Sequence, residues 1–116
     1  MYSMKEACTL TNMTYENLKF YCNEGLVPNV KRDHNNRRVF DEKDVKWIKD
    51  LTCLKKCGMS IQEMKKYLEL CLQGEATIVS RKKMLARKQE ELRASIKELE
   101  DSISYIGWKQ NFYDDV

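Results

Sequence analysis

The chain has 116 residues, of which 42% are hydrophobic and 34% are charged, and its formal net charge is +3. This composition is too apolar for a disordered chain, and 4 Gly and 1 Pro are too few for an all-β sandwich. No run approaches the roughly 18 apolar residues of a membrane span, and residues 1–20 lack the layout of a signal peptide. We therefore expect a mainly α-helical, cytoplasmic protein with one small domain and an appendage.

The distribution of cysteine and of charge constrains the setting and the partners. An odd number of cysteines without an export signal predicts reduced thiols rather than a disulfide framework. These are Cys8, Cys22, Cys53, Cys57 and Cys71. All the excess positive charge lies in residues 1–74, whereas residues 75–116 are neutral overall. An anionic partner, if there is one, should therefore bind the first part of the chain.

Capping residues mark the predicted helices. Ser3 and Ser60 each stand three residues before a Glu, which is the capping-box spacing, and Thr14 and Asp41 are suitable N-caps. Glycines that can adopt the left-handed conformation close three of the helices: Gly25, Gly58 and Gly74. The predicted helices are 4–10, 14–24, 42–57, 60–73 and 76–110.

The first two helices and their short link have the proportions of a helix-turn-helix. Asn12 occupies the turn, where a residue tolerant of left-handed backbone is needed. Tyr21 can belong to the inner face of the pair. The second helix is expected to expose side chains that can bond base edges or phosphates. These are Tyr15, Glu16, Asn17, Lys19 and Asn23.

Residues 29–40 predict a short β-hairpin. Pro28 prevents helix before it, and the tip at 34–36 is polar and turn-forming. The hairpin carries one acid, Asp33, against four cations: Lys31, Arg32, Arg37 and Arg38. A basic hairpin beside a recognition helix indicates phosphate contact more than a merely solvated turn.

The last helix repeats apolar residues with coiled-coil spacing. The predicted seam consists of Leu85, Leu92, Ile96, Leu99, Ile103 and Ile106. About 35 helical residues extend roughly 50 Å, too far for one small core to cover. Homodimerisation through this seam is the preferred interpretation, and a helix folded back on its own domain is the alternative. The aromatic residues near the end could cap the seam or dock on the partner.

Together these motifs resemble the MerR family of bacterial transcription regulators. The resemblance is carried by YSMKEA (2–7), MTYENLKFY (13–21), GLVP (25–28), NRRVF (36–40), DV (44–45) and LKKCGMSIQEM (54–64). It implies a winged helix-turn-helix head over residues 1–74 with its wing at 29–40, an antiparallel coiled-coil helix over 75–110 and a short tail at 111–116. Family members form homodimers that bind double-stranded promoter DNA with a long spacer. They bend and untwist that spacer, and so act on RNA polymerase indirectly at the promoter.

The resemblance also implies the DNA-contacting set. It consists of Tyr15, Asn17, Lys19, Tyr21, Lys31, Arg32, Arg37 and Arg38. Lys19 stands where the family usually has Arg, so the bidentate fork is lost. Cys22 replaces a frequent Glu, and Asn36 and Arg37 replace a common Gly and aromatic residue. The operator preference of relatives is therefore not transferable.

Sensing is predicted at a cysteine, because we expect no room for a large ligand domain and no cofactor. Cys53 and Cys57 have a spacing that could hold a soft metal, but without further ligands we expect no metal site. Residues 44–59, 74–78 and Arg81 are similar to the thiol- and aldehyde-responsive (NmlR/AdhR-like) subgroup, in which the residue matching Cys53 is the proposed sensor of a stress response. Lys49 and Lys56 lie near Cys53 along the helix, and cations favour a nucleophilic thiolate. The competing interpretation is a core cysteine.

The sequence contains no residue pattern typical of a catalytic site, because paired carboxylates, a nucleophile with its base and a phosphate-binding loop are all missing. The single histidine, His34, falls at the predicted hairpin tip and is expected to be solvated. Two alternatives remain: a MerR-type regulator that responds to a metal or another signal without thiol chemistry, and a coiled-coil interaction protein whose helix-turn-helix is vestigial.

Overall fold

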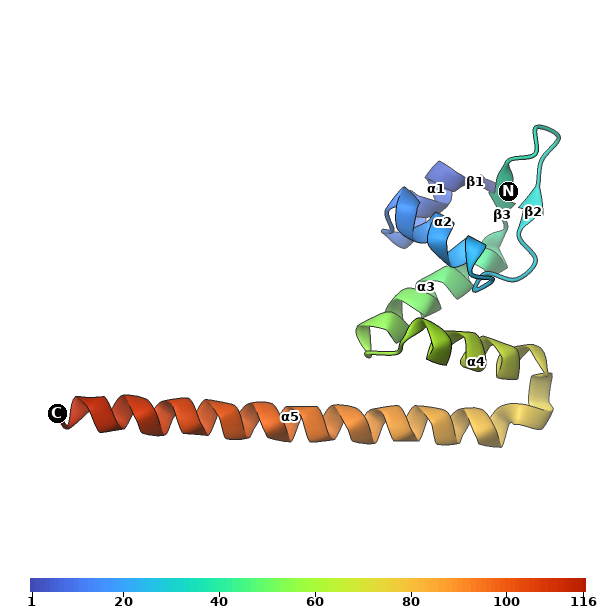
Figure 1. Cartoon of the computed structure of the whole chain (residues 1–116). Coiled ribbons are helices and arrows are strands. Elements are labelled where there is room, and N and C mark those ends of the chain that lie inside the picture. Colours follow the sequence, from blue (N-terminus) through green and yellow to red (C-terminus); the bar gives the residue numbers. More distant parts are fainter.

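The computed structural model describes residues 1–116, which form a globular head and one long projecting helix (Figure 1). The molecule measures 74 × 35 × 19 Å along its principal axes. The elements are β1 (Tyr2–Ser3), α1 (Met4–Thr11), α2 (Tyr15–Asn23), β2 (Lys31–Arg32), β3 (Arg38–Phe40), α3 (Glu42–Lys56), α4 (Ile61–Leu72), the 3₁₀ turn η1 (Gly74–Thr77) and α5 (Ile78–Asp114). The predicted mainly helical winged helix-turn-helix with a long final helix is confirmed.

The predicted helix starts are set by side-chain caps. The Ser3 and Ser60 hydroxyls each accept a hydrogen bond from a backbone N–H at 3.1 Å, and the matching Glu carboxylate accepts one from the backbone N–H of the capping Ser. Asp41 forms the same reciprocal pair with Asp44 at the start of α3. At the other end, Gly58 has a φ of +88°, the left-handed conformation that L side chains rarely adopt. Caps satisfy orphan backbone groups, so α1 to α4 begin directly after their capping residues, whereas α5 begins at Ile78 without a side-chain cap.

A three-stranded antiparallel sheet joins the wing to the N-terminus. The strand order is β1-β3-β2, with Val39 of the central strand opposite both Ser3 and Lys31. The predicted hairpin is confirmed as β2 and β3. The sequence did not indicate β1, because two residues are too few to show an alternating pattern.

The head has one small core made by α1 to α4 and the sheet. Its fully buried members include Ala7, Leu18, Leu26, Phe40, Ile48, Leu51 and Met64. Trp47 on α3 is half-buried against this core, and its Nε1 donates a hydrogen bond to the Leu26 carbonyl at 2.7 Å. This bond ties the helix after the wing to the segment before it, so the wing base is held from both sides.

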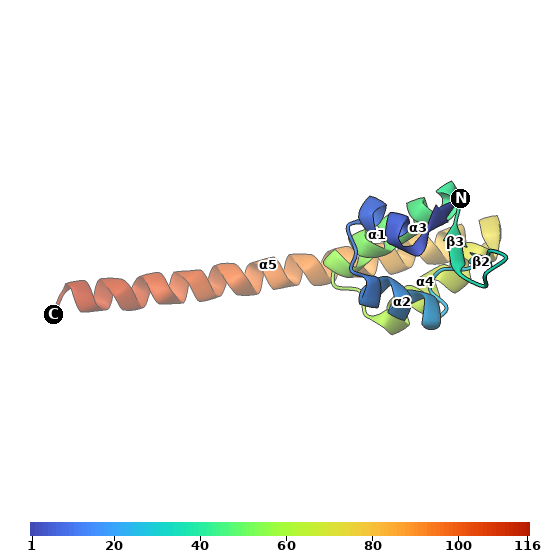
Figure 2. The same ribbon diagram turned by 90° about the horizontal axis from the view of Figure 1, so that it is seen from above.

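The rod α5 starts beneath the head and then leaves it. Figures 1 and 2 show α4 lying along the first part of α5 while the remainder projects alone. The rod ends at Asp114 rather than near residue 110, so most of the predicted 111–116 tail is helical. No helix is apolar over a long enough stretch to span a membrane.

Candidate nucleic-acid interface

The helix-turn-helix presents α2 as its outer helix. Asn12 has a φ of 55°, so the turn uses the left-handed conformation expected of it. Tyr15, Asn17 and Lys19 are exposed along α2, as predicted. Phe20 is also exposed beside Lys19, although it was not among the predicted contact residues.

Tyr21 differs from the other predicted contact residues, because it belongs to the core. Only 4% of it is exposed, and burial raises the pKa of its phenol. Its hydroxyl makes no hydrogen bond within the chain, yet no buried side-chain polar atom lacks a partner, so the oxygen reaches the surface. The ring is therefore structural, and only the hydroxyl remains available to a phosphate.

The wing turn is organised by Asp33. Its Oδ1 accepts hydrogen bonds from the backbone N–H groups of Asn35 and Arg37, both at 2.9 Å. These backbone bonds, that of Arg37 foremost, lower the pKa of the Asp33 carboxyl below its ordinary value. Asn36 takes a φ of 62° in the same turn. His34 lies exposed at the tip, as expected.

The wing cations differ in how they are held. Arg38 donates from Nη2 to Oδ1 of Asn23 at 2.6 Å, which joins the wing to the end of α2. Arg32 donates to the Asn36 carbonyl at 3.0 Å. Lys31 is paired with Asp41 at 3.0 Å on the side towards α3. Arg37 makes no ion pair and extends from the turn.

A hollow between the helix-turn-helix and the wing brings together three of the five cations that were predicted to contact DNA. Its lining includes Tyr15 from the start of α2 and Arg32, Arg37 and Arg38 from the wing. Asn17, Lys19 and Lys31 lie outside it. Because Arg38 lines this hollow and also bonds Asn23 at the end of α2, a polar surface joins α2 to the wing.

The cysteines fall into two environments. Cys53 and Cys57 are exposed, whereas Cys8, Cys22 and Cys71 are half-buried. Burial raises the pKa of the Cys8 and Cys22 thiols. Cys53 is therefore not a core residue of its own subunit. No group of three or more His, Cys, Asp and Glu side chains is arranged to hold a metal.

The predicted seam of α5 is uncovered within one chain. Leu85 and Leu92 are each 40% exposed and Ile103 is 71% exposed. Ile96, Leu99 and Ile106 are also exposed. The alternative in which α5 folds back on its own head is wrong for most of the helix, because only the first part of α5 contacts the head and the remainder projects alone. Tyr105, Trp108 and Phe112 stack along the end of α5 and are likewise exposed.

Comparison with known proteins decides the family. Residues 2–71 match the profile described as the MerR HTH family regulatory protein, and residues 45–106 match the profile described as MerR, DNA binding. The chain belongs to the MerR family. The predicted family is therefore confirmed, and this MerR-family chain is a transcription regulator rather than a member of an enzyme family.

Two curated relatives are similar over much of the chain. An uncharacterised HTH-type transcriptional regulator of Haemophilus influenzae is 33% identical over 97% of this chain and 83% of its own length. The transcriptional regulator AdhR of Bacillus subtilis is 36% identical over 69% of this chain, which spans 57% of AdhR. These likenesses are consistent with the NmlR/AdhR-like subgroup.

Solved structures extend the likeness to almost the whole chain. HiNmlR, a MerR family regulator lacking the sensor domain and bound to promoter DNA, superposes with a TM-score of 0.79 at 32% identity. The match covers 98% of this chain and 90% of HiNmlR. A MerR family structure from Listeria monocytogenes gives a TM-score of 0.83 at 26% identity, covering 98% of this chain and 86% of that one.

Proposed function

We propose that this MerR-family chain is a cytoplasmic, homodimeric regulator that binds an inverted repeat in double-stranded promoter DNA and distorts the spacer between the half-sites. RNA polymerase is then an indirect partner at the same promoter. The observation that supports this most is the polar surface that joins α2 to the wing through the bond between Arg38 and Asn23. The likeness to HiNmlR, which is bound to promoter DNA, supports the same function.

Each head would bind DNA through three kinds of contact. Asn17 and Lys19 on the exposed face of α2 would reach base edges in the major groove. Tyr15 and the hydroxyl of Tyr21 would bond phosphates. The wing cations Lys31, Arg32, Arg37 and Arg38 would lie along the adjacent backbone. Lys31 would need to exchange its ion pair with Asp41 for a phosphate.

Dimerisation would proceed through the α5 seam, in antiparallel orientation. Two seam pairs, Leu85 with Ile106 and Leu92 with Leu99, lie symmetrically about residues 95–96, so an antiparallel copy can place these apolar side chains against one another. The two heads then lie at opposite ends of a shared rod about 55 Å long. In this division residues 1–74 bind DNA, residues 75–110 dimerise, and residues 111–116 approach the head of the partner.

The signal would be an electrophile that reacts with Cys53. The exposed thiol of Cys53 can add to an aldehyde carbonyl, forming a C–S bond while the carbonyl π bond breaks and the thiol proton passes to the oxygen. An adduct near the end of α3 would alter how this helix packs, and with it the geometry of bound DNA. Cys57 is also exposed and is the C-cap residue of α3, so it serves as the matched comparison for Cys53.

The sensor assignment is tested with matched alanine variants. Purified wild type, Cys53→Ala and Cys57→Ala are treated with methylglyoxal, mapped by mass spectrometry and assayed for transcription from a bound promoter. The adduct and the transcriptional response should vanish in Cys53→Ala and persist in Cys57→Ala. A full response from Cys53→Ala would refute the sensor role and leave DNA binding untouched.

DNA binding itself is tested by measuring affinity against salt concentration. For a regulator that neutralises several phosphates, the logarithm of the binding constant falls linearly with the logarithm of the salt concentration, because binding releases counterions from the DNA. The alternative of a coiled-coil interaction protein predicts dimerisation without any DNA binding.

A further inference from the structure

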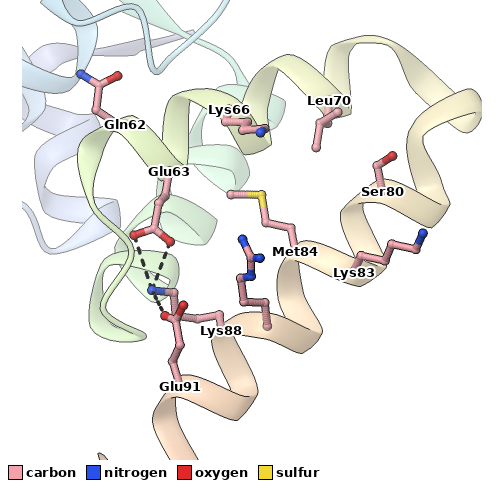
Figure 3. Close-up of a pocket in the computed structure, with 10 residues that line it drawn as sticks. Gln62, Glu63, Lys66, Leu70, Ser80, Lys83, Met84, Lys88 and Glu91 are labelled. Carbon is pink, nitrogen blue, oxygen red and sulfur yellow. Dashed lines mark hydrogen bonds and ion pairs between the residues drawn. The ribbon is translucent and has the colours of Figure 1, made fainter.

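Lys88 occupies an unusual position on α5, where it contacts three parts of the chain. Its Nζ lies 3.1 Å from Oε2 of Glu63 on α4 and 2.8 Å from Oε2 of Glu91 on α5 (Figure 3). It also donates to the carbonyl oxygen of Gly58, between α3 and α4, at 3.4 Å. An ammonium has three donors, and all three have acceptors here.

Burial distinguishes Lys88 from the other paired cations. Its side chain is only 12% exposed, whereas that of Lys31 is 51% exposed and that of Arg93 is 61% exposed. Hydrogen bonds to Glu91 and Glu63 raise the pKa of Lys88, so it stays charged. Glu63 in turn closes the capping box with Ser60 at the start of α4. One carboxylate therefore caps α4 and holds it to α5.

Polar contacts join the head to the rod at two points along α4, and Met84 of α5 packs against the core between them. At the C-terminal end of α4, the buried Thr77 hydroxyl donates to the Leu70 carbonyl, and Arg81 donates to the Gly74 carbonyl at 2.6 Å. At the N-terminal end the fastening is Lys88. Thr77 and Lys88 are about 16 Å apart along the helix. Without the second point, α4 could pivot on η1.

We propose that Lys88 is a positioning residue that fixes the angle between head and rod, and thereby the spacing and tilt of the two recognition helices in the dimer. This inference rests on the proposed antiparallel dimer. Since the heads sit at opposite ends of the rod, a change of this angle moves them relative to each other. Lys88 touches no DNA, so it acts on spacer selection and not on half-site affinity.

The test uses inverted repeats that the wild-type protein selects from random duplexes, rebuilt with spacers lengthened or shortened one base pair at a time. Affinities are measured by fluorescence anisotropy for the wild type, Lys88→Met, Lys88→Arg and Glu63→Gln, with Lys97→Met as the control on the exposed part of α5. Circular dichroism and sedimentation establish that each variant is folded and dimeric. Glu63→Gln removes the charge and keeps a capping side chain, so it covers the case in which Lys88→Met is unstable.

Lys88→Met and Glu63→Gln should bind an isolated half-site like the wild type but lose about tenfold of the discrimination between the best and neighbouring spacers. Lys88→Arg should retain part of this discrimination between spacers, and the control Lys97→Met should retain all of it. Folded variants with the wild-type spacer preference would overturn the proposal.

A second readout separates this proposal from the function it rests on. Spin labels introduced at Asn35 of both wings through a noncanonical amino acid report the head-to-head distance in the free dimer. A broader distance distribution in Lys88→Met supports the positioning role, and an unchanged one overturns it. If the wild type selects no DNA, the proposed function fails, and this distance measurement still decides the role of Lys88.

Discussion

Replacing Ile96 by alanine tests the dimer seam close to its centre. The side chain is 55% exposed in one chain, so about half of it remains for a partner to cover. Complete burial of an isoleucine contributes about 1.5–3 kcal/mol, and alanine keeps only a small part of that area. The loss is then about 1 kcal/mol in each subunit and about 2 kcal/mol in the dimer. Since about 1.4 kcal/mol corresponds to tenfold, the dimer should dissociate about 30-fold more readily.

Sedimentation equilibrium over a range of protein concentrations measures this change. Lys97→Ala is the matched control, because Lys97 is the next residue along α5 and lies off the heptad seam. Its dimer dissociation constant should stay within a factor of about two of the wild type. An unchanged constant in Ile96→Ala, or an equal weakening in Lys97→Ala, would refute the assignment of the seam.

Three further predictions concern the head. Arg38→Met should weaken binding about tenfold on all sequences alike and make the salt slope shallower in anisotropy titrations, whereas Lys82→Met on α5 should change neither. Iodoacetamide should alkylate the exposed Cys53 faster than Cys22, because burial raises the pKa of the Cys22 thiol. Timed mass spectrometry measures both rates, and faster alkylation of Cys22 would contradict this prediction. Backbone and lysine hydrogen bonds lower the pKa of Asp41 from 3.8 to about 2. The stability that Asp41 contributes is therefore fully present above about pH 4 and is lost as the pH falls towards 2. In urea unfolding, the free energy of unfolding of Asp41→Asn should therefore fall less steeply than that of the wild type between pH 4 and pH 2.

Local signals in the sequence predicted the helices and the turn well. Ser3 and Ser60 identify helix starts because a hydroxyl and a carboxylate satisfy backbone groups within three residues of each other. Gly58 and Asn12 stand where the backbone is left-handed. Each of these features depends on neighbours in the chain, so the residues themselves carry the information.

Features that depend on distant contacts were not predicted. β1 exists because Tyr2 and Ser3 pair with β3, and nothing in the two residues reveals that partner. Arg38 is held by a residue fifteen positions earlier, Asn23, which only the folded wing brings close. The burial of Tyr21 agrees with its place on the predicted inner face of the helix pair, whereas the resemblance had placed the same residue among the DNA contacts.

Selection of duplexes from a random pool by the purified chain, followed by salt titration of the best sequence, tests the central claim most directly. We predict enrichment of an inverted repeat that binds two chains per duplex. Four cations per subunit that neutralise phosphates would give a slope of log affinity against log salt of about −7. No enrichment, binding of a single chain, or affinity that is independent of salt would contradict a dimeric regulator that binds promoter DNA.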